Sequence, residues 1–373
     1  MTRIMVLLGV LLFIFNCNKT PTQCLKYERE ITLTRATEEA EYFYTQYIDK
    51  ENGEDLILGN PQNSKTLYYH NLNDGSIVKK VVLPCRQAIR GFYCDRNDDI
   101  YYCPNHSPEL LKYSHQTFQI DTLLNMDIPY LENCIKHNIK LGVGIEFMVA
   151  PCSPLIINKP YYYIPNIIHP DYNILEQPPL YIFEEVADSL LIHTEIVHFP
   201  DKLHQNGKSL FPYNLGITYT INDKNELIVS HFADHHIYVY NNDKLDTIVL
   251  CKSKYVDKLP SFINKNEIHN EQVYVQRSYS ENSYVGIYYD KYRNLYYRIA
   301  KLKSKFADSH SDQSDFVVII IDENFKMIGE QIFNHTDYLS VGLIITKEGL
   351  LLKKTDNYSG KTRYGLFKIN TDE

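Results

Sequence analysis

The stretch "SHFADHH", residues 230–236, gathers side chains of the types that bind metal ions and transfer protons. It contains His231, Asp234, His235 and His236. Imidazoles and carboxylates that converge on one point can hold a metal ion such as zinc. On an extended strand, however, His231 and His235 would lie about 13 Å apart, at about 3.3 Å per residue. The spacing therefore favours a polar connection between two strands, and no metal-binding residue is predicted.

A second group of candidates is basic and recurs where strands are expected to end. Aligning the second strands of a repeated hairpin gives five equivalent positions: Gly59, Cys103, Ser230, Arg298 and Lys353. Connections between units would share this face, and one of them, "PCRQAIRG", carries Arg90. Arg90, His231, Arg298 and Lys353 are predicted to line one mouth of the domain and to bind the carboxylate or phosphate of a small anionic ligand. The alternative is ordinary ion pairing with neighbouring Asp and Glu.

Tyrosines form the third group. The stretch "NKPYYYIPNIIHPDYNILEQPP", residues 158–179, is interpreted as a long loop that interrupts the third unit. Loops of this length are often functional. Tyr161, Tyr162 and Tyr163 are therefore predicted to stack on a glycan or on the side chains of a protein partner. The alternative is that they pack against their own domain, and the absence of Trp weakens the glycan interpretation.

No cofactor is predicted, and calcium is the one alternative. Asp49, Asp95, Asp223 and Asp290 each follow an expected first strand. Six-bladed enzymes of the lactonase type hold calcium with such oxygen ligands in the central channel. The favoured interpretation is that each Asp opens a hairpin turn and accepts hydrogen bonds from the next backbone amides. Glu146 is the one acid expected to face the channel.

Motifs of the common enzyme classes are missing from the chain. It contains no nucleophile elbow, phosphate loop or His-Glu-x-x-His motif. The sequence therefore leans away from an enzyme, and no catalytic residue is predicted.

The candidates sit on a repeated unit made of an apolar strand, a tight polar turn and a second apolar strand. Six copies begin at Tyr42, Gly91, Gly144, Gly216, Gly286 and Gly342. Each is followed by another strand pair, such as "HHIYVYNNDKLDTIVL". Four antiparallel strands repeated about six times predict an all-β fold, a six-bladed β-propeller. A pair of β-sandwiches is the alternative.

The two ends of the repeat predict how the ring closes. The sixth unit stops after its third strand, while "KYEREITLT", residues 26–34, is interpreted as a lone strand ahead of the first unit. We expect this N-terminal strand to complete the last blade, because an open sheet edge is a liability. Residues 26–373 are accordingly predicted to form a single β-propeller domain.

The N-terminus is typical of an exported lipoprotein. Residues 1–16 contain Arg3 and an apolar run too short to span a bilayer, which predicts a signal peptide. The run ends at Asn16-Cys17, which resembles a bacterial lipobox and implies that Cys17 is acylated. Residues 17–25 would then tether the domain to the lipid bilayer, since two or more acyl chains anchor stably. The alternative is a conventional signal peptide with an incidental cysteine.

Composition narrows the list of partners. The chain has 38 Lys and Arg against 46 Asp and Glu, a net charge of −8. This net charge argues against a nucleic acid partner, which would require a basic face. Beyond Cys17 there are seven cysteines without a Cys-x-x-Cys pair, so we expect most of them to be small core residues.

Four parts of the chain carry a family resemblance: the lipobox-led start and the segments "YDKYRNLYYRIA", "IIDENFKMIGE" and "ELIVSHFADHHIYVYNND". They resemble a lipoprotein family of Bacteroides-like gut bacteria, domain of unknown function 4221. The resemblance implies a six-bladed propeller and an envelope location. It implies no reaction and no catalytic residue.

Together these features predict an envelope lipoprotein, on the outer membrane and facing the periplasm, that acts as a binding or scaffold propeller. Its ligand would be a small anionic molecule, a glycan or a protein partner. A metal-dependent, lactonase-like hydrolase and an accessory subunit of an outer-membrane transport complex are the alternatives.

Overall fold

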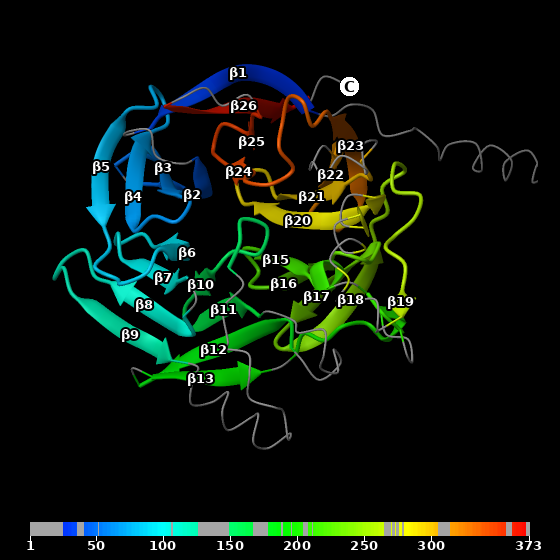
Figure 1. The fold of residues 1–373 in the computed structure, drawn as a ribbon, viewed down its shortest axis with the longest axis horizontal. Helices are drawn as coiled ribbons and strands as arrows, with labels where there is room; N and C mark the ends of the chain where they lie inside the picture. The colour runs from blue at the N-terminus through cyan, green and yellow to red at the C-terminus, as the bar shows by residue number, and fades with distance from the viewer. Residues whose placement is uncertain are drawn as a thin grey trace, which may run out of the picture.

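A computed structural model of the chain is a nearly all-β ring of six four-stranded antiparallel sheets (Figure 1). The structure describes residues 25–35, 41–50, 52–105, 107–125, 149–166, 178–187, 189–194, 196–203, 208–210, 212–264, 270, 273, 276–277, 280–304, 314–355 and 360–370. The predicted signal peptide, Cys17, Glu146 and most of the predicted tether lie outside these residues. No helix among the described residues is long and apolar enough to cross a membrane.

The first three blades follow the chain, each with its strands in sequence order. Blade 1 contains β2 (Tyr42–Asp49), β3 (Asp55–Pro61), β4 (Thr66–Asn71) and β5 (Ile77–Val82). Blade 2 contains β6 (Ile89–Cys94), β7 (Ile100–Pro104), β8 (Glu109–Tyr113) and β9 (Ile120–Asn125). Blade 3 contains β10 (Ile156–Asn158), β11 (Tyr161–Pro165), β12 (Leu180–Val186) and β13 (Ser189–Thr194).

Blades 4 and 5 repeat this order. Blade 4 contains β15 (Ile217–Ile221), β16 (Leu227–His231), β17 (His236–Asn241) and β18 (Lys244–Leu250). Blade 5 contains β20 (Ser283–Asp290), β21 (Leu295–Lys301), β22 (Phe316–Ile321) and β23 (Met327–Phe333). Two 3-10 turns, η2 (Asp201–Leu203) and η3 (Pro212–Leu215), precede blade 4, and β14 (Lys208–Ser209) pairs with β19 (Ile263–Asn264).

Blade 6 is built from both ends of the chain. Its order is β24 (Ile344–Ile345), β25 (Leu350–Lys353), β26 (Lys361–Ile369) and then β1 (Leu25–Thr34). β1 and β26 are antiparallel, and their register runs from Leu25 opposite Ile369 to Thr34 opposite Lys361. In Figure 1 the blue β1 and the red β26 lie side by side at the top of the ring. The six-bladed propeller and its predicted closure by an N-terminal strand are both confirmed, with the strand beginning at Leu25.

The sequence pattern explains the layering of each blade. Second and third strands are largely apolar and mostly buried, as in the run Phe316–Ile321, in which every residue is buried. Outer strands alternate, as β18 does, so that one face meets solvent. Near the axis there is no room for some side chains. A Cβ on Gly91 would lie 2.1 Å from Val149 Cγ1, which explains why this inner strand carries a glycine.

Blade 3 corrects one sequence prediction. The third unit was expected to begin with a hairpin from Gly144, and Tyr161, Tyr162 and Tyr163 were expected in a loop. Instead, β10 is the innermost strand and these tyrosines form most of β11, the second strand. Lys159 and Pro160 make the turn between β10 and β11. The prolines on both sides of the tyrosines look like loop signals, although they only mark the two ends of a short strand.

Candidate functional site

The "SHFADHH" stretch links β16 to β17, as predicted, and its centre is a buried carboxylate. Asp234 is 2% exposed. Its Oδ1 accepts hydrogen bonds from Lys202 Nζ at 2.7 Å and from the His236 backbone amide at 3.0 Å. Its Oδ2 accepts from the Tyr238 hydroxyl. Burial opposes ionisation, but the hydrogen bonds from Lys202, Tyr238 and His236 outweigh it and lower the pKa of Asp234 to about 2.

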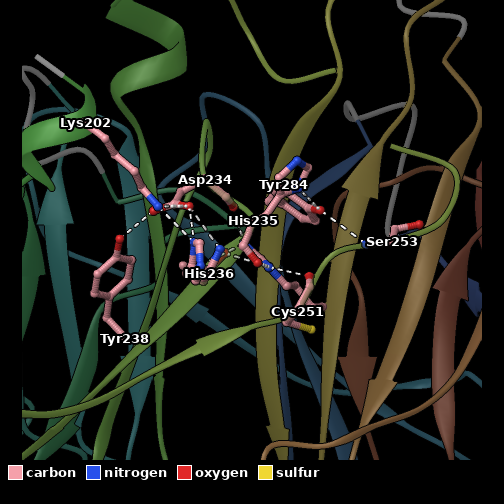
Figure 2. A network of polar contacts seen from close by, with 10 residues as sticks. Lys202, Asp234, His235, His236, Tyr238, Cys251, Ser253 and Tyr284 are labelled. Carbon is pink, nitrogen blue, oxygen red and sulfur yellow. Dashed lines mark hydrogen bonds and ion pairs between the residues drawn. The ribbon is translucent and has the colours of Figure 1, made fainter. Parts of the chain in front are cut away.

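Lys202 presents a cation at the solvent side of this carboxylate (Figure 2). It lies on η2, and its side chain is 47% exposed. Its Nζ lies 2.9 Å from His236 Nδ1 as well as 2.7 Å from Asp234. In this ion pair the Asp234 carboxylate is buried and fixed by its hydrogen bonds, whereas the Lys202 side chain is accessible to solvent.

Arg298 holds the other side of the same connection from the neighbouring blade. It lies on β21 and is fully buried. Its Nε donates to Ser230 Oγ at 3.0 Å, and its two terminal nitrogens donate to the backbone carbonyls of Asp234, His235, His236 and Cys251 at 2.6–3.2 Å. These contacts match the five N–H donors of a guanidinium. The group also lies 3.6 Å from the centre of the Tyr284 ring, a cation–π contact.

This placement corrects the prediction that Arg298 receives a ligand anion, because its donors are already taken by carbonyls of the chain. The other predicted members of that patch lie on separate blades. Lys353 is buried on blade 6, where Nζ donates to the Tyr42 carbonyl at 2.9 Å and pairs with Glu41 at 3.0 Å. Arg90, on blade 2, donates to Asn105 Oδ1 at 3.3 Å. The structure does not bring these three cations together.

His231 is also buried, and neither ring nitrogen has a hydrogen-bond partner among the described residues. Its ring packs 5.5 Å from Phe199 and 5.2 Å from Tyr238, centre to centre. Burial lowers the pKa of His231 to about 4. Burial also lowers the pKa of His235 to about 4, and the positive charges of nearby Lys252 and Arg298 add to this shift. Both imidazoles are therefore neutral at pH 7. No group of three or more metal-ligating side chains occurs in the part of the chain that the structure describes.

Turn geometry accounts for two of the four aspartates considered for calcium. Asp95 Oδ1 accepts from the amides of Asn97 and Asp99 at 2.9 and 3.0 Å. Asp290 Oδ1 accepts from the Tyr292 amide at 3.0 Å, and its Oδ2 pairs with Arg293. Asp49 and Asp223 instead accept from tyrosine hydroxyls of blade 5, Tyr292 and Tyr289.

Residues 149–155 pack against the innermost strands. Tyr219 donates to the Pro154 carbonyl, Tyr288 to the Pro151 carbonyl at 3.5 Å, and Ser153 to the Ile217 carbonyl. Burial raises the pKa of all three phenols Tyr44, Tyr219 and Tyr288 far above the usual range. Tyrosines and aliphatic residues, rather than acids, therefore occupy this described part of the ring's interior.

The open end of the Lys202 ion pair borders a cavity of about 610 Å³, within the size range of small-molecule sites. The cavity lies between residues 196–202 and the outer strands β17 and β18. Its apolar lining consists of Ile196, Phe199, Pro200, Tyr238, Tyr240, Leu245 and Ile248. Its polar lining consists of His198, Asp201, Lys202 and His236. Sequence reasoning missed Lys202, because an isolated lysine in an irregular connection carries no motif.

Comparisons with known proteins support the fold and the resemblance. The family model described as domain of unknown function (DUF4221) matches residues 191–332, a stretch that includes Lys202, Asp234 and Arg298. A crystal structure of a DUF4221 family member from Bacteroides vulgatus has a TM-score of 0.76 at 17% identity, covering 93% of this chain and 98% of that one. The resemblance stated from the sequence is thus confirmed.

A second solved structure, of a protein from Bacteroides fragilis described as exported, has a TM-score of 0.54 at 9% identity. It covers 95% of this chain and 98% of that chain. No curated protein matches the chain.

Replacing Arg298 with Met should lower the free energy of unfolding by at least about 3 kcal/mol, because four buried carbonyls would lose a charged donor. Arg298→Lys should restore only part of the loss, since lysine lacks the planar fork. Urea denaturation measures both changes. The exposed Arg96 provides the matched control, and Arg96→Met should stay within about 0.5 kcal/mol of wild type. A loss below about 1 kcal/mol in Arg298→Met would contradict the assigned role.

The pKa of His231 predicts acid sensitivity. Its folded value of about 4 lies below the ordinary 6.5, so the unfolded chain binds more protons between these values. The free energy of unfolding should therefore fall by up to about 3 kcal/mol as pH drops from 6.5 to 4, at 1.36 kcal/mol per pKa unit.

His231→Phe should remove this part of the pH dependence. It should also raise stability at pH 7.5 by about 1 kcal/mol, because two unpartnered nitrogens are replaced by carbon. Urea titrations at several pH values test both effects, with the exposed His198→Phe as control. An unchanged pH slope in His231→Phe would refute the assignment.

Proposed function

We propose that this chain is a lipid-anchored envelope propeller that binds a small anionic ligand in the cavity between residues 196–202 and strands β17 and β18. The observation that carries the proposal is the Lys202 ammonium. It is half-exposed at the cavity, while its carboxylate partner Asp234 is buried behind it.

A carboxylate-bearing ligand fits the donors at this end of the cavity. An ammonium has three N–H donors; that of Lys202 donates to Asp234 Oδ1 at 2.7 Å and lies 2.9 Å from His236 Nδ1, a nitrogen that is equally close to Asp234 Oδ1. The apolar wall formed by Phe199, Tyr240 and Ile248 would bury the body of the ligand. Small-molecule sites commonly combine such a wall with a few fixed polar groups.

Asp234 and Tyr238, behind the Lys202 ammonium, are suited to hold this cation rather than to transfer protons. Asp234 is held ionised by its hydrogen bonds, and the Tyr238 hydroxyl is committed to it, with a pKa well above the usual range because of burial and this bond. His235 shares a hydrogen bond of 2.8 Å with the Tyr284 hydroxyl. General acid–base catalysis needs a group whose pKa lies near the working pH, and these groups are tuned away from it.

An envelope location is supported by the apolar N-terminal run that ends at Cys17 and by the similarity to a protein described as exported. An acylated Cys17 would lie within about 28 Å of Leu25, eight residues later, which is the reach of an extended chain. Leu25 begins β1 in blade 6 and donates its amide to Gln331 of blade 5, whereas the cavity borders strands β17 and β18 of blade 4.

The ligand proposal predicts a charge-dependent thermal shift. Benzoate and glucuronate are the probes, with benzyl alcohol and glucose as their uncharged counterparts. At least one carboxylate should raise the unfolding midpoint, since a ligand at 100 times its dissociation constant adds about 2.7 kcal/mol. Lys202→Gln should abolish the shift, and the exposed Lys326→Gln on blade 5 should retain it. A shift that survives in Lys202→Gln, or none at millimolar concentrations, would contradict the proposal.

The anchor predicts a change in fractionation. In a Gram-negative host, the wild-type chain should incorporate labelled palmitate and sediment with membranes. Cys17→Ala should lose the label and move to the soluble fraction, because the acyl chains that anchor the domain are no longer attached. The buried Cys94→Ala serves as the control and should still be labelled. Equal labelling of Cys17→Ala and wild type would rule out the assigned attachment site.

A further inference from the structure

A second cavity, of about 310 Å³, adjoins the first at the interface of blades 3 and 4. Ile196 and Tyr240 line both cavities. The two cavities therefore adjoin at these side chains, and we call them together the blade 3–4 groove. One end is formed by Lys202 and His236, and the other by the hairpin turns of blades 3 and 4.

The far end of the groove is rich in amide side chains. Asn158, Asn225 and Asn242 line it, together with Lys159, Tyr161 and Asp243. Asn158 Nδ2 donates to Asn225 Oδ1 at 3.1 Å and so joins the β10–β11 turn to the β15–β16 turn. An amide offers two donors and two acceptor sites, so this pair retains hydrogen-bonding capacity for a ligand. Amides and a carboxylate can form hydrogen bonds with the hydroxyl groups of a sugar, and a tyrosine ring can pack against the apolar face of its ring.

Strand geometry argues against a peptide as the occupant. His236, Tyr238 and Tyr240 occupy alternate positions of β17, so one face of this strand lines the groove. The backbone of β17 is paired with β16 on one side and β18 on the other. It offers no free hydrogen bonds for strand addition, which is how extended peptides gain affinity at a sheet edge. β17 can therefore contact a ligand only through its side chains.

We propose that the blade 3–4 groove binds a short, linear acidic oligosaccharide, with a uronate carboxylate at Lys202 and hydroxyl groups of a later sugar at Asn158 and Asn225. This inference rests on the proposed function and adds the ligand class and its direction. Tyr161 then contacts the sugar from β11, and the half-exposed Leu245 and Ile248 bound the acidic end.

Titration calorimetry with galacturonate and its di- and trimer tests this. The trimer should bind the wild-type protein at least tenfold more tightly than the monomer. Asn225→Gly should reduce trimer affinity about tenfold and leave monomer affinity unchanged. Glycine suits a positive φ, and Asn225 has a φ of 60°. Asn294→Gly is the matched control, because Asn294 has a φ of 53° in the equivalent turn of blade 5.

The outcomes separate this inference from the proposed function. Monomer binding that depends on Lys202 but gains nothing with chain length overturns the oligosaccharide and leaves the anion site standing. A length effect that Asn225→Gly and Asn294→Gly reduce equally also overturns it. Tighter binding of an acidic tripeptide, triglutamate, than of the trimer would assign the groove to peptides instead. Absence of binding by every uronate and by benzoate would remove both proposals.

Discussion

The pairing of β1 with β26 is the constraint on which the rest of the ring depends. A propeller blade can bury both faces only if it has a neighbour on each side, and blade 6 is incomplete without a strand from the other end of the chain. Ile31 and Leu33 of β1 pack into one buried cluster with Ile57 and Tyr68 of blade 1. The Leu25 amide also donates to Gln331 of blade 5 at 3.1 Å. One strand thus contacts three consecutive blades.

Polar side chains perform a comparable task between blades 4 and 5. Arg298 reaches from β21 to the connection that ends at β17, so the position of Asp234 is fixed from the neighbouring blade. Burying a guanidinium is costly unless its donors are satisfied, and here they are. Asp234 in turn fixes Lys202 on the other side. The position of Lys202 at the cavity therefore depends on contacts that begin in the core. Of Arg298, Asp234 and Lys202, the lysine alone has a strongly exposed side chain.

Much of the fold could be predicted because a propeller repeats its pattern. Segments such as "GIYYDKYRNLYYR" predict a hairpin from local sequence alone. The strand at residues 26–34, which belongs to no other unit, completes the sixth unit. Blade 3 was misjudged because its strands β10 and β11 are short and flanked by Pro160 and Pro165. The site was harder to predict. The sequence shows that Arg298 is basic but not that five acceptors surround it. Lys202 becomes a candidate only when its contact with Asp234, 32 residues away, is known.

The two strands that close the ring are the first and the last described in the chain, so synthesis order matters. A growing chain presents β1 before any partner exists, and β26 emerges after every other blade. Until then β1 remains an unpaired strand edge, and such edges invite pairing with other chains. Blades 1 to 5 can assemble in order as they appear, but the ring itself closes in a single late event. The chain is therefore exposed to misassembly until β26 has emerged and paired with β1.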